Sequence, residues 1–336
     1  MIHTRALTKT FRLRRETVEA VRGVDLDVAN GELVAFLGPN GAGKSTTLRM
    51  LTGLVEPTSG TAIVAGHDAR RDSAGVRRGI GYIGQGHAAG HYHYVRDEMV
   101  TQGCAYGLPR RAARERADEL LETLELTGMA KRQSATLSGG QRRRLDIALG
   151  LVHRPPLLFL DEPSTGLDPQ NRANLWTHVM AVRERFDTTL FLTTHYLEEA
   201  DEMAERVVII DHGRIIADDT PGRLKATLAG DRITLGLPDP DAAATAARMA
   251  ERGTGARELD VTGPHVTFRV PHGEEVLPEY LRALAEAGIT ARTARTATST
   301  LDDVFLTLTG RSLREETGAA REGNRDEREG HEEVAV

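Results

Sequence analysis

The segment from Gly38 to Thr46 constrains the fold of this chain more than any other. It matches the P-loop pattern G-x-x-x-x-G-K-S/T at every fixed position. The residues are Gly38-Pro39-Asn40-Gly41-Ala42-Gly43-Lys44-Ser45-Thr46. In such a loop the glycines let successive backbone N–H groups point at phosphate oxygens, and the following helix presents its positive N-terminal end. Lys44 is expected to reach the β- and γ-phosphates of a nucleotide, and the Ser45 hydroxyl to ligate Mg²⁺. The alternative is an ordinary glycine-rich turn before a helix, which the complete match disfavours.

Five short apolar runs predict a largely parallel α/β sheet, the kind of sheet on which P-loops occur. They lie at residues 33–37, 80–83, 157–160, 189–192 and 207–210 and are separated by helical patterns. Between the second and third runs the chain is mostly helical, and residues 114–126 place on one helix face Ala117, Leu120, Leu121 and Leu124. We therefore predict a nucleotide-binding domain of residues 1–230, with a helical subdomain inserted at about residues 88–155.

A different pattern begins after residue 230. Alternating strand-like and helix-like stretches at residues 233–237, 242–251, 266–270 and 275–287 predict a small α+β accessory domain, residues 231–310. Residues 311–336 are rich in Arg, Glu, Asp and Gly and nearly lack large apolar side chains. Such a segment cannot bury enough surface to offset the entropy lost on ordering, so we expect a disordered, charged tail.

Composition disfavours several classes of protein. The 336 residues carry a net charge of −6, which argues against a general nucleic-acid binder. No apolar run approaches the roughly 18 residues of a membrane span, and no signal peptide is recognisable, so we expect the chain to stay in the cytoplasm. Cys104 is the single cysteine, so an intrachain disulfide is impossible, and we expect Cys104 to be a small buried apolar residue.

The pentapeptide Leu137-Ser138-Gly139-Gly140-Gln141 narrows the interpretation of the P-loop. Ser138 and Gln141 have the spacing of a capping box, so Ser138 is expected to begin a helix. Gly139 and Gly140 leave the first N–H groups of that helix uncovered, so an anion can approach them. An ordinary capped helix, the alternative, would not need both glycines. Together the P-loop and this signature resemble the ATP-binding cassette (ABC) family.

The resemblance covers residues 1 to about 230 and implies roles for other residues. Asp161, after the apolar run 157–160, matches the Walker B aspartate that contacts Mg²⁺, and Glu162 matches the general base for the attacking water. Asp168 matches the D-loop aspartate, which lies across a dimer interface. In the family the signature meets the γ-phosphate held by the partner's P-loop. The chain is therefore expected to form a homodimer in order to hydrolyse ATP.

Three more residues match the family by position. His195 corresponds to the switch histidine that contacts the γ-phosphate, and Gln85 to the Q-loop glutamine that senses Mg²⁺ and water and couples the site to a membrane partner. Phe11 lies where the family places an aromatic ring against adenine. Simpler explanations exist: a lone histidine after a strand is usually incidental, and a phenylalanine early in a β region can simply belong to the protein core.

The chain departs from the family pattern after Gln85, where a loop contains His87, His91 and His93. Alternating histidines without cysteine or carboxylate support form a polar surface more often than a metal site, so no metal is predicted there. In relatives this region contacts the transmembrane subunit. We expect the unusual composition to reflect a particular permease.

Residues 299–310 carry a narrower resemblance, to the closing segment of ATPases from daunorubicin-resistance exporters. The segment reads Ser299-Thr300-Leu301-Asp302-Asp303-Val304-Phe305-Leu306-Thr307-Leu308-Thr309-Gly310. It also predicts an amphipathic helix that packs through Leu301, Val304, Phe305 and Leu308.

The two resemblances together imply the ATPase of a drug or antibiotic exporter, peripheral on the cytoplasmic side of the cell membrane and paired with a separate integral membrane permease. One alternative is export of a lipid, polysaccharide or ion. The other is a soluble ABC ATPase of translation or chromosome maintenance, which a single compact cassette disfavours.

Overall fold

The computed structural model describes residues 1–12, 16–86, 88–90 and 92–310. The chain divides into two compact units: residues 1–196 with 203–216, and residues 197–202 with those from 217 onward. The predicted domain limits, at residue 230 and for the helical subdomain, stay predictions. The predicted tail lies outside the described residues.

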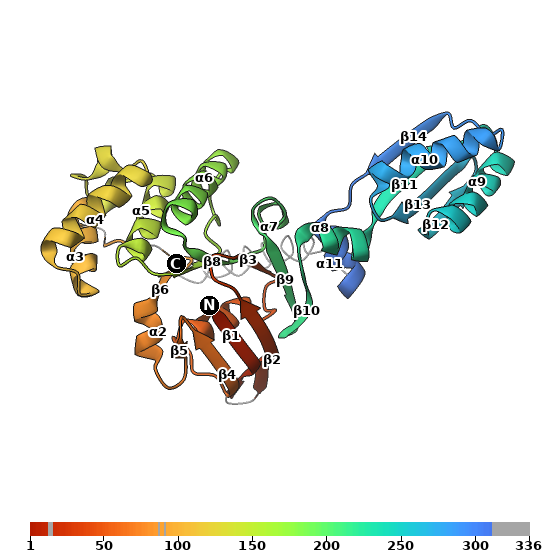
Figure 1. Ribbon diagram of the computed structural model, residues 1–336. Coiled ribbons are helices and arrows are strands. Elements are labelled where there is room, and N and C mark those ends of the chain that lie inside the picture. Colours follow the sequence, from red (N-terminus) through yellow and green to blue (C-terminus); the bar gives the residue numbers. More distant parts are fainter. Residues whose placement is uncertain (13–15, 87, 91, 311–336) are drawn as a thin grey trace, which may run out of the picture. The chain divides into compact units, whose positions relative to one another are not determined.

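A six-stranded sheet forms the centre of the first unit (Figure 1). Its strand order is β10-β9-β3-β8-β7-β6, with bounds β3 Leu33–Leu37, β6 Ile80–Ile83, β7 Leu157–Asp161, β8 Thr189–Thr194, β9 Arg206–Asp211 and β10 Arg214–Asp219. Every residue of β3, β7 and β8 is buried, as expected of parallel strands covered on both faces. The five predicted apolar runs all lie in these strands, which confirms the predicted α/β class.

A second, antiparallel sheet packs in the same unit, with strand order β2-β1-β4-β5. Its strands are β1 Ile2–Arg12, β2 Thr17–Val28, β4 Ser59–Val64 and β5 His67–Asp68. One hydrophobic cluster joins both sheets to helix α1 (Lys44–Leu51), and it includes Ile2, Phe36, Leu48 and Phe191. Helix α2 (Ser73–Gly79) leads from β5 into β6. The P-loop is therefore held between two packed sheets.

Helices gather beside the six-stranded sheet in the stretch where the sequence predicted them (Figure 1). They are α3 Val95–Ala105, α4 Arg110–Thr123, α5 Gly139–Leu151 and α6 Pro169–Phe186, with short 3₁₀ turns η1 Thr127–Met129 and η2 Ser134–Thr136. The four residues of the predicted apolar face, three on α4 and Leu124 at its C-cap, are all at most 2% exposed. Arg96 of α3 and Asp118 of α4 form a two-bond ion pair at 2.6 and 2.7 Å.

The prediction that Cys104 is buried was wrong, because its side chain is exposed. Helix α3 buries Val95, Met99, Val100 and Gly103. Cys104 follows this stripe by one residue, about 100° around the helix, and so faces solvent.

The second unit contains a β-α-β-β-α-β motif whose sheet has the order β12-β13-β11-β14, all antiparallel. Its elements are β11 Asp231–Gly236, α9 Pro240–Gly253, β12 Arg257–Thr262, β13 His265–Val270, α10 Gly273–Glu286 and β14 Thr293–Ala297. Ile233, Phe268 and Tyr280 belong to its own hydrophobic cluster. The sequence patterns did not reveal β12 and β14, because β12 is exposed throughout and β14 nearly so, without an apolar face.

Four short helical segments complete this unit: α7 Leu197–Met203, α8 Pro221–Leu224, the π-helical turn η3 Lys225–Ala229, and α11 Leu301–Thr309. Helix α11 begins with a capping box between Thr300 and Asp303 and packs on η3 and α8. Three of its four predicted packing residues are fully buried and Leu308 is half-buried. Among helices of the described residues, none combines the length and apolarity that crossing a membrane requires.

Candidate functional site

Strand register brings the predicted catalytic segments to one edge of the six-stranded sheet. The parallel pairs are Leu37 with Thr194, Asp161 with Thr193, and Ile83 with Leu160. Carboxyl ends of parallel strands meet at the same edge, and ligands of open α/β sheets bind there. The segments that carry Gly38, Gln85, Glu162 and His195 therefore emerge side by side.

The P-loop joins β3 to α1 through a left-handed backbone turn. Gly43, the N-cap of α1, has φ 106°, and a Cβ there would lie 2.5 Å from the carbonyl oxygen of Ala20. Only glycine suits this position. Ser45 and Thr46 follow in the first turn and are half-buried, whereas Asn40 and Gly41 are exposed.

Lys44 is 5% exposed, and its Nζ donates to the carbonyl oxygens of Gly38, at 2.6 Å, and Pro39, at 2.9 Å. Burial lowers the pKa of Lys44, against the opposing effect of the charges on Glu162 and Asp161. A buried ammonium whose hydrogen bonds go to neutral carbonyls is well suited to receive an anionic phosphate.

Asp161 ends β7 and is 2% exposed. Its Oδ1 accepts a hydrogen bond from Thr193 Oγ1 at 2.6 Å, and Thr193 Oγ1 in turn accepts from the backbone N–H of Glu162 at 3.1 Å. Burial raises the pKa of Asp161, and the hydrogen bond from Thr193 opposes that shift. Thr193 thus holds two neighbouring acidic residues, and no sequence pattern marks it because threonine inside a strand is ordinary.

Glu162 has a left-handed backbone, with φ 47°. Its Oε2 lies 3.3 Å from Nδ1 of His195 and accepts from Thr165 Oγ1 at 3.2 Å. Burial acts to raise the pKa of Glu162, but the His195 contact, the Lys44 charge and the Thr165 bond together hold that pKa below its ordinary value. Glu162 is therefore a charged, oriented carboxylate with its side chain 12% exposed.

The signature segment forms the N-terminus of α5, as the sequence predicted. Ser138 Oγ accepts from Gln141 N at 3.3 Å, and Gln141 Oε1 accepts from Ser138 N at 3.0 Å. Ser138 and Gly139 are exposed, and a Cβ on Gly139 would meet nothing within 4 Å. The cap is intact while its outer surface is open.

Asp168 caps helix α6 beside the signature. Its Oδ1 accepts from Asn171 N at 2.9 Å, and its Oδ2 accepts from Asn171 Nδ2 at 2.5 Å. A Cβ on Gly140 would approach Asn171 Oδ1 to 2.8 Å. The two predicted dimer-contact segments are therefore in contact through Asn171.

Phe11 belongs to the antiparallel sheet, and the histidine loop is only partly described. Phe11 is on β1 in the antiparallel sheet, 37% exposed, with Lys9 Nζ 5.1 Å from its ring centroid. His93 has a 69% exposed side chain, 3.9 Å from Glu98 Oε1. His87 and His91 lie outside the described residues.

The predicted magnesium donors are chemically consistent with that ion. A serine hydroxyl, a carboxylate and an amide oxygen, from Ser45, Asp161 and Gln85, are the hard oxygen ligands that Mg²⁺ takes. The buried Asp161 carboxylate, with its raised pKa, is a group whose charged form a cation would stabilise. Gln85 is exposed on the segment after β6.

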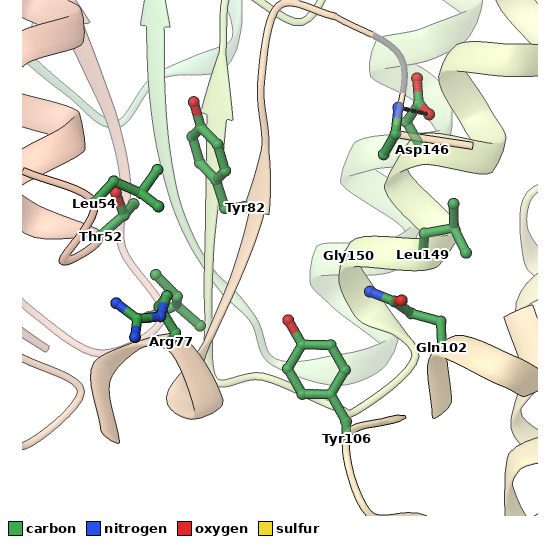
Figure 2. Close-up of a pocket in the computed structure, with 11 residues that line it drawn as sticks. Thr52, Leu54, Arg77, Tyr82, Gln102, Tyr106, Asp146, Leu149 and Gly150 are labelled. Carbon is green, nitrogen blue, oxygen red and sulfur yellow. Dashed lines mark hydrogen bonds between the residues drawn. The ribbon is translucent and has the colours of Figure 1, made fainter. Parts of the chain in front are cut away.

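A cavity of about 190 Å³ opens where that segment leaves β6 (Figure 2). Tyr82 lines it from β6 and Arg77 from α2, and the opposite side is lined by Gln102 of α3, Tyr106 at the end of α3 and Leu149 of α5.

The chain is similar to known proteins in sequence and in fold. Residues 21–165 match the family model described as ABC transporter. The chain is 42% identical to the daunorubicin/doxorubicin resistance ATP-binding protein DrrA of Streptomyces peucetius, over 92% of each chain. It is 41% identical to the doxorubicin resistance ATP-binding protein DrrA of Mycobacterium tuberculosis, over 87% of this chain and 89% of the relative. It is 34% identical to the linearmycin resistance ATP-binding protein LnrL of Bacillus subtilis, over 88% of this chain and 95% of the relative.

Among solved structures, a dimeric post-hydrolysis state of the ATP-binding cassette MJ0796, bound to ADP and Pi, superposes with a TM-score of 0.60. The match has 26% identity and covers 66% of this chain and 98% of the cassette. Together with the sequence relatives, this likeness identifies the fold as that of an ABC ATPase cassette. The chain belongs to the ABC transporter family, as an ATP-hydrolysing, ATP-binding subunit of the drug-resistance type.

Proposed function

We propose that this chain energises the efflux of a drug or antibiotic through a separate integral membrane permease, working as a homodimer on the cytoplasmic side of the membrane. The observation that carries the ATPase part is the meeting of Lys44, Asp161, Glu162 and His195 at one sheet edge. The cargo class is supported by relatives named for resistance to daunorubicin, doxorubicin and linearmycin, each aligned over most of the chain.

In this proposal the P-loop from Gly38 to Thr46 binds the phosphates through its backbone N–H groups, and Lys44 contacts the β- and γ-phosphates. Glu162 accepts a proton from the attacking water while His195, 3.3 Å from it, orients the carboxylate and contacts the γ-phosphate. Phe11 contacts the adenine from its exposed position on β1.

Mg²⁺ would be held by Ser45, Asp161 and Gln85, and when bound it neutralises the phosphate charge that builds up during transfer. Residues of the chain position the magnesium ligands and exclude water. Thr193 keeps the Asp161 carboxylate in place through its 2.6 Å hydrogen bond. Burial of Lys44 and Asp161 removes water and strengthens every charge–charge interaction between them.

The open outer surface of the signature supports the homodimer. Ser138, Gly139 and Asp168 are exposed. The capping box satisfies Ser138 Oγ and the N–H of Gln141 within the chain, which leaves the N–H groups of Gly139 and Gly140 for a phosphate of a second subunit.

The proposed site is tested by Glu162→Gln. This substitution keeps the side-chain shape and phosphate binding but removes the base, so we expect an ATP-dependent dimer in light scattering and a loss of turnover of at least about 100-fold. Lys44→Ala is the control that should neither bind ATP nor dimerise. Normal steady-state hydrolysis by the Glu162→Gln protein would contradict the assigned base.

The permease and the cargo class are tested in cells. We expect affinity purification of the Glu162→Gln protein with ATP, from gently solubilised membranes, to recover one multispanning membrane protein. Co-expression of that protein with the wild-type chain, but not with the Glu162→Gln variant, should raise survival in daunorubicin or linearmycin. Recovery of ribosomal or DNA-associated proteins instead would contradict the transport role.

A further inference from the structure

Helix α5 carries a buried ion pair that no sequence motif indicated. Arg143 is 4% exposed and Asp146 1% exposed, and Arg143 Nη1 lies 3.9 Å from Asp146 Oδ2. Charged side chains are rarely buried this completely unless their partners compensate for lost hydration. The identity of those partners therefore indicates what the pair does.

The partners of this pair lie on both sides of Gln85. Arg143 Nη1 donates to the carbonyl oxygen of Gly84 at 2.8 Å, one residue before Gln85. Asp146 Oδ1 accepts from the backbone N–H groups of Ala88 at 2.9 Å and Ala89 at 3.4 Å, and the dashed line in Figure 2 marks the first of these. Two residues about one helical turn apart thus hold the chain before and after Gln85, at Gly84 and at Ala88 and Ala89. We call the stretch between these contacts the Gln85 segment.

Arg143 also reaches the segment that carries the base. Its Nε donates to the carbonyl oxygen of Pro163 at 2.7 Å, directly after Glu162. Strands β6 and β7, which precede these two segments, are neighbours with parallel register. One guanidinium therefore joins the loops that follow two adjacent strands, and its planar fork of donors suits such a bridge.

A second ion pair, between the buried Arg116 and the half-buried Glu119, shows that i, i+3 spacing and a buried arginine alone do not produce this arrangement. Arg116 on α4 is 3% exposed, pairs with Glu119 at 2.7 Å and donates to the carbonyl oxygen of Leu151. It has the same i, i+3 spacing, yet its contacts lie on the helical scaffold. Arg116 and Glu119 are therefore a matched control for Arg143 and Asp146.

We propose that Arg143 and Asp146 are positioning residues. Through their hydrogen bonds, together called the clasp, they fix the position of the Gln85 segment relative to Glu162. Through this clasp a displacement of α5, whose N-terminus is the signature, moves both Gln85 and the base. The proposal rests on the role proposed for Gln85 in the preceding subsection.

The first test compares Arg143→Met/Asp146→Leu with Arg116→Met/Glu119→Leu. Each double substitution removes both charges, so neither leaves an unpaired buried ion that would unfold the protein. We expect the clasp variant to lose about 10-fold in kcat, the size typical of supporting contacts, with nucleotide affinity within about twofold of wild type. Amide hydrogen exchange at Ala88 and Ala89 should accelerate in the clasp variant alone. Unchanged exchange in a folded clasp variant would overturn the proposal.

The second test repeats the clasp substitution in a Gln85→Ala background. If the clasp acts through Gln85, it should cause little further loss of kcat there, because its target is already gone. A full additional 10-fold loss would assign the pair a general structural role and overturn the proposal. Wild-type turnover by Gln85→Ala alone would instead refute the role of Gln85, and the exchange measurement would still decide whether the clasp exists.

Discussion

At the scale of single residues, the site depends on a carboxylate kept charged in a partly buried position. Glu162 has a left-handed φ of 47°, which costs a non-glycine residue on the order of 1 kcal/mol. Its backbone N–H hydrogen bonds to both the carbonyl oxygen and Oγ1 of Thr193, at 3.0 and 3.1 Å, and these bonds offset that cost. This backbone geometry places the side chain against His195.

Replacement of His195 by Ala should shift the acid limb of the ATPase pH profile. Burial alone raises the pKa of Glu162, and the His195 contact is the largest effect that lowers it. Without the imidazole the pKa of Glu162 rises, so the base becomes protonated, and the rate falls, at a higher pH than in the wild type. A pH series of kcat measures this, independently of the overall loss of rate.

Thr165→Ala serves as the comparison, because the Thr165 bond has a smaller effect on the same carboxylate. Its acid limb should move in the same direction by less. The lowered pKa of Glu162 also makes the folding stability depend on pH, and acid again has the unfavourable effect. The lowered pKa of Glu162 stabilises the fold above the unfolded-state pKa, and that stabilisation is lost as the pH falls through the folded pKa. An acid limb unmoved by His195→Ala would show that a group other than Glu162 limits the rate.

At the scale of elements, the N-termini of α5 and α6 are built as a pair. Each begins with a side-chain cap, Ser138 and Asp168 respectively. Gly140 faces Asn171 across a space too small for a methyl group, whereas Gly139 faces open space. Packing against Asn171 thus requires glycine at position 140 but not at position 139, although the sequence pattern treats the two alike.

We therefore expect opposite effects from alanine at the two glycines. Gly140→Ala should lower the free energy of unfolding by about 1 kcal/mol, because the added Cβ pushes Asn171 off Asp168. Gly139→Ala should raise it by about 0.5 kcal/mol in the monomer, because alanine favours the helix and meets no obstacle. Urea denaturation followed by fluorescence of Trp176, the only tryptophan and a buried residue of α6, measures both. Equal effects at both positions would contradict the packing argument.

At the scale of the whole molecule, the two units have separate hydrophobic cores. The core of the first unit includes Phe159 and the core of the second includes Phe268, and both side chains are 0% exposed. Trp176 belongs to the first unit, so its fluorescence follows the unfolding of that unit.

Phe268→Ala should accordingly destabilise the second unit by about 3–5 kcal/mol, the usual cost of removing a buried phenyl ring. The transition followed by circular dichroism should split or begin at lower urea, while the fluorescence transition of Trp176 and the affinity for ATP stay unchanged. Phe159→Ala is the matched change in the first unit and should shift the Trp176 transition. A Trp176 transition displaced equally by both variants would show a single cooperative unit.

Much of the fold and of the site could be predicted from the sequence, because these features depend on residues that are neighbours along the chain. A continuous apolar run such as Leu157–Leu160 predicts a buried parallel strand. Ser138 and Gln141 predict their own capping box, since a cap involves residues within one helical turn. The glycines of the P-loop likewise determine a backbone turn that only they permit.

Other features depend on contacts that sequence proximity does not reveal. The bond from Thr193 to Asp161 spans 32 residues, and that from Arg143 to Gly84 spans 59. The exposed Cys104 and the edge strand β12 escaped prediction because burial is decided by what packs alongside. The sequence by itself determined the chemical groups, the buried parallel strands and the helix start at Ser138 of this ATPase. Only the tertiary structure decided which side chains hold those groups in place, because pairing between distant strands and helices, rather than local propensity, brings them together.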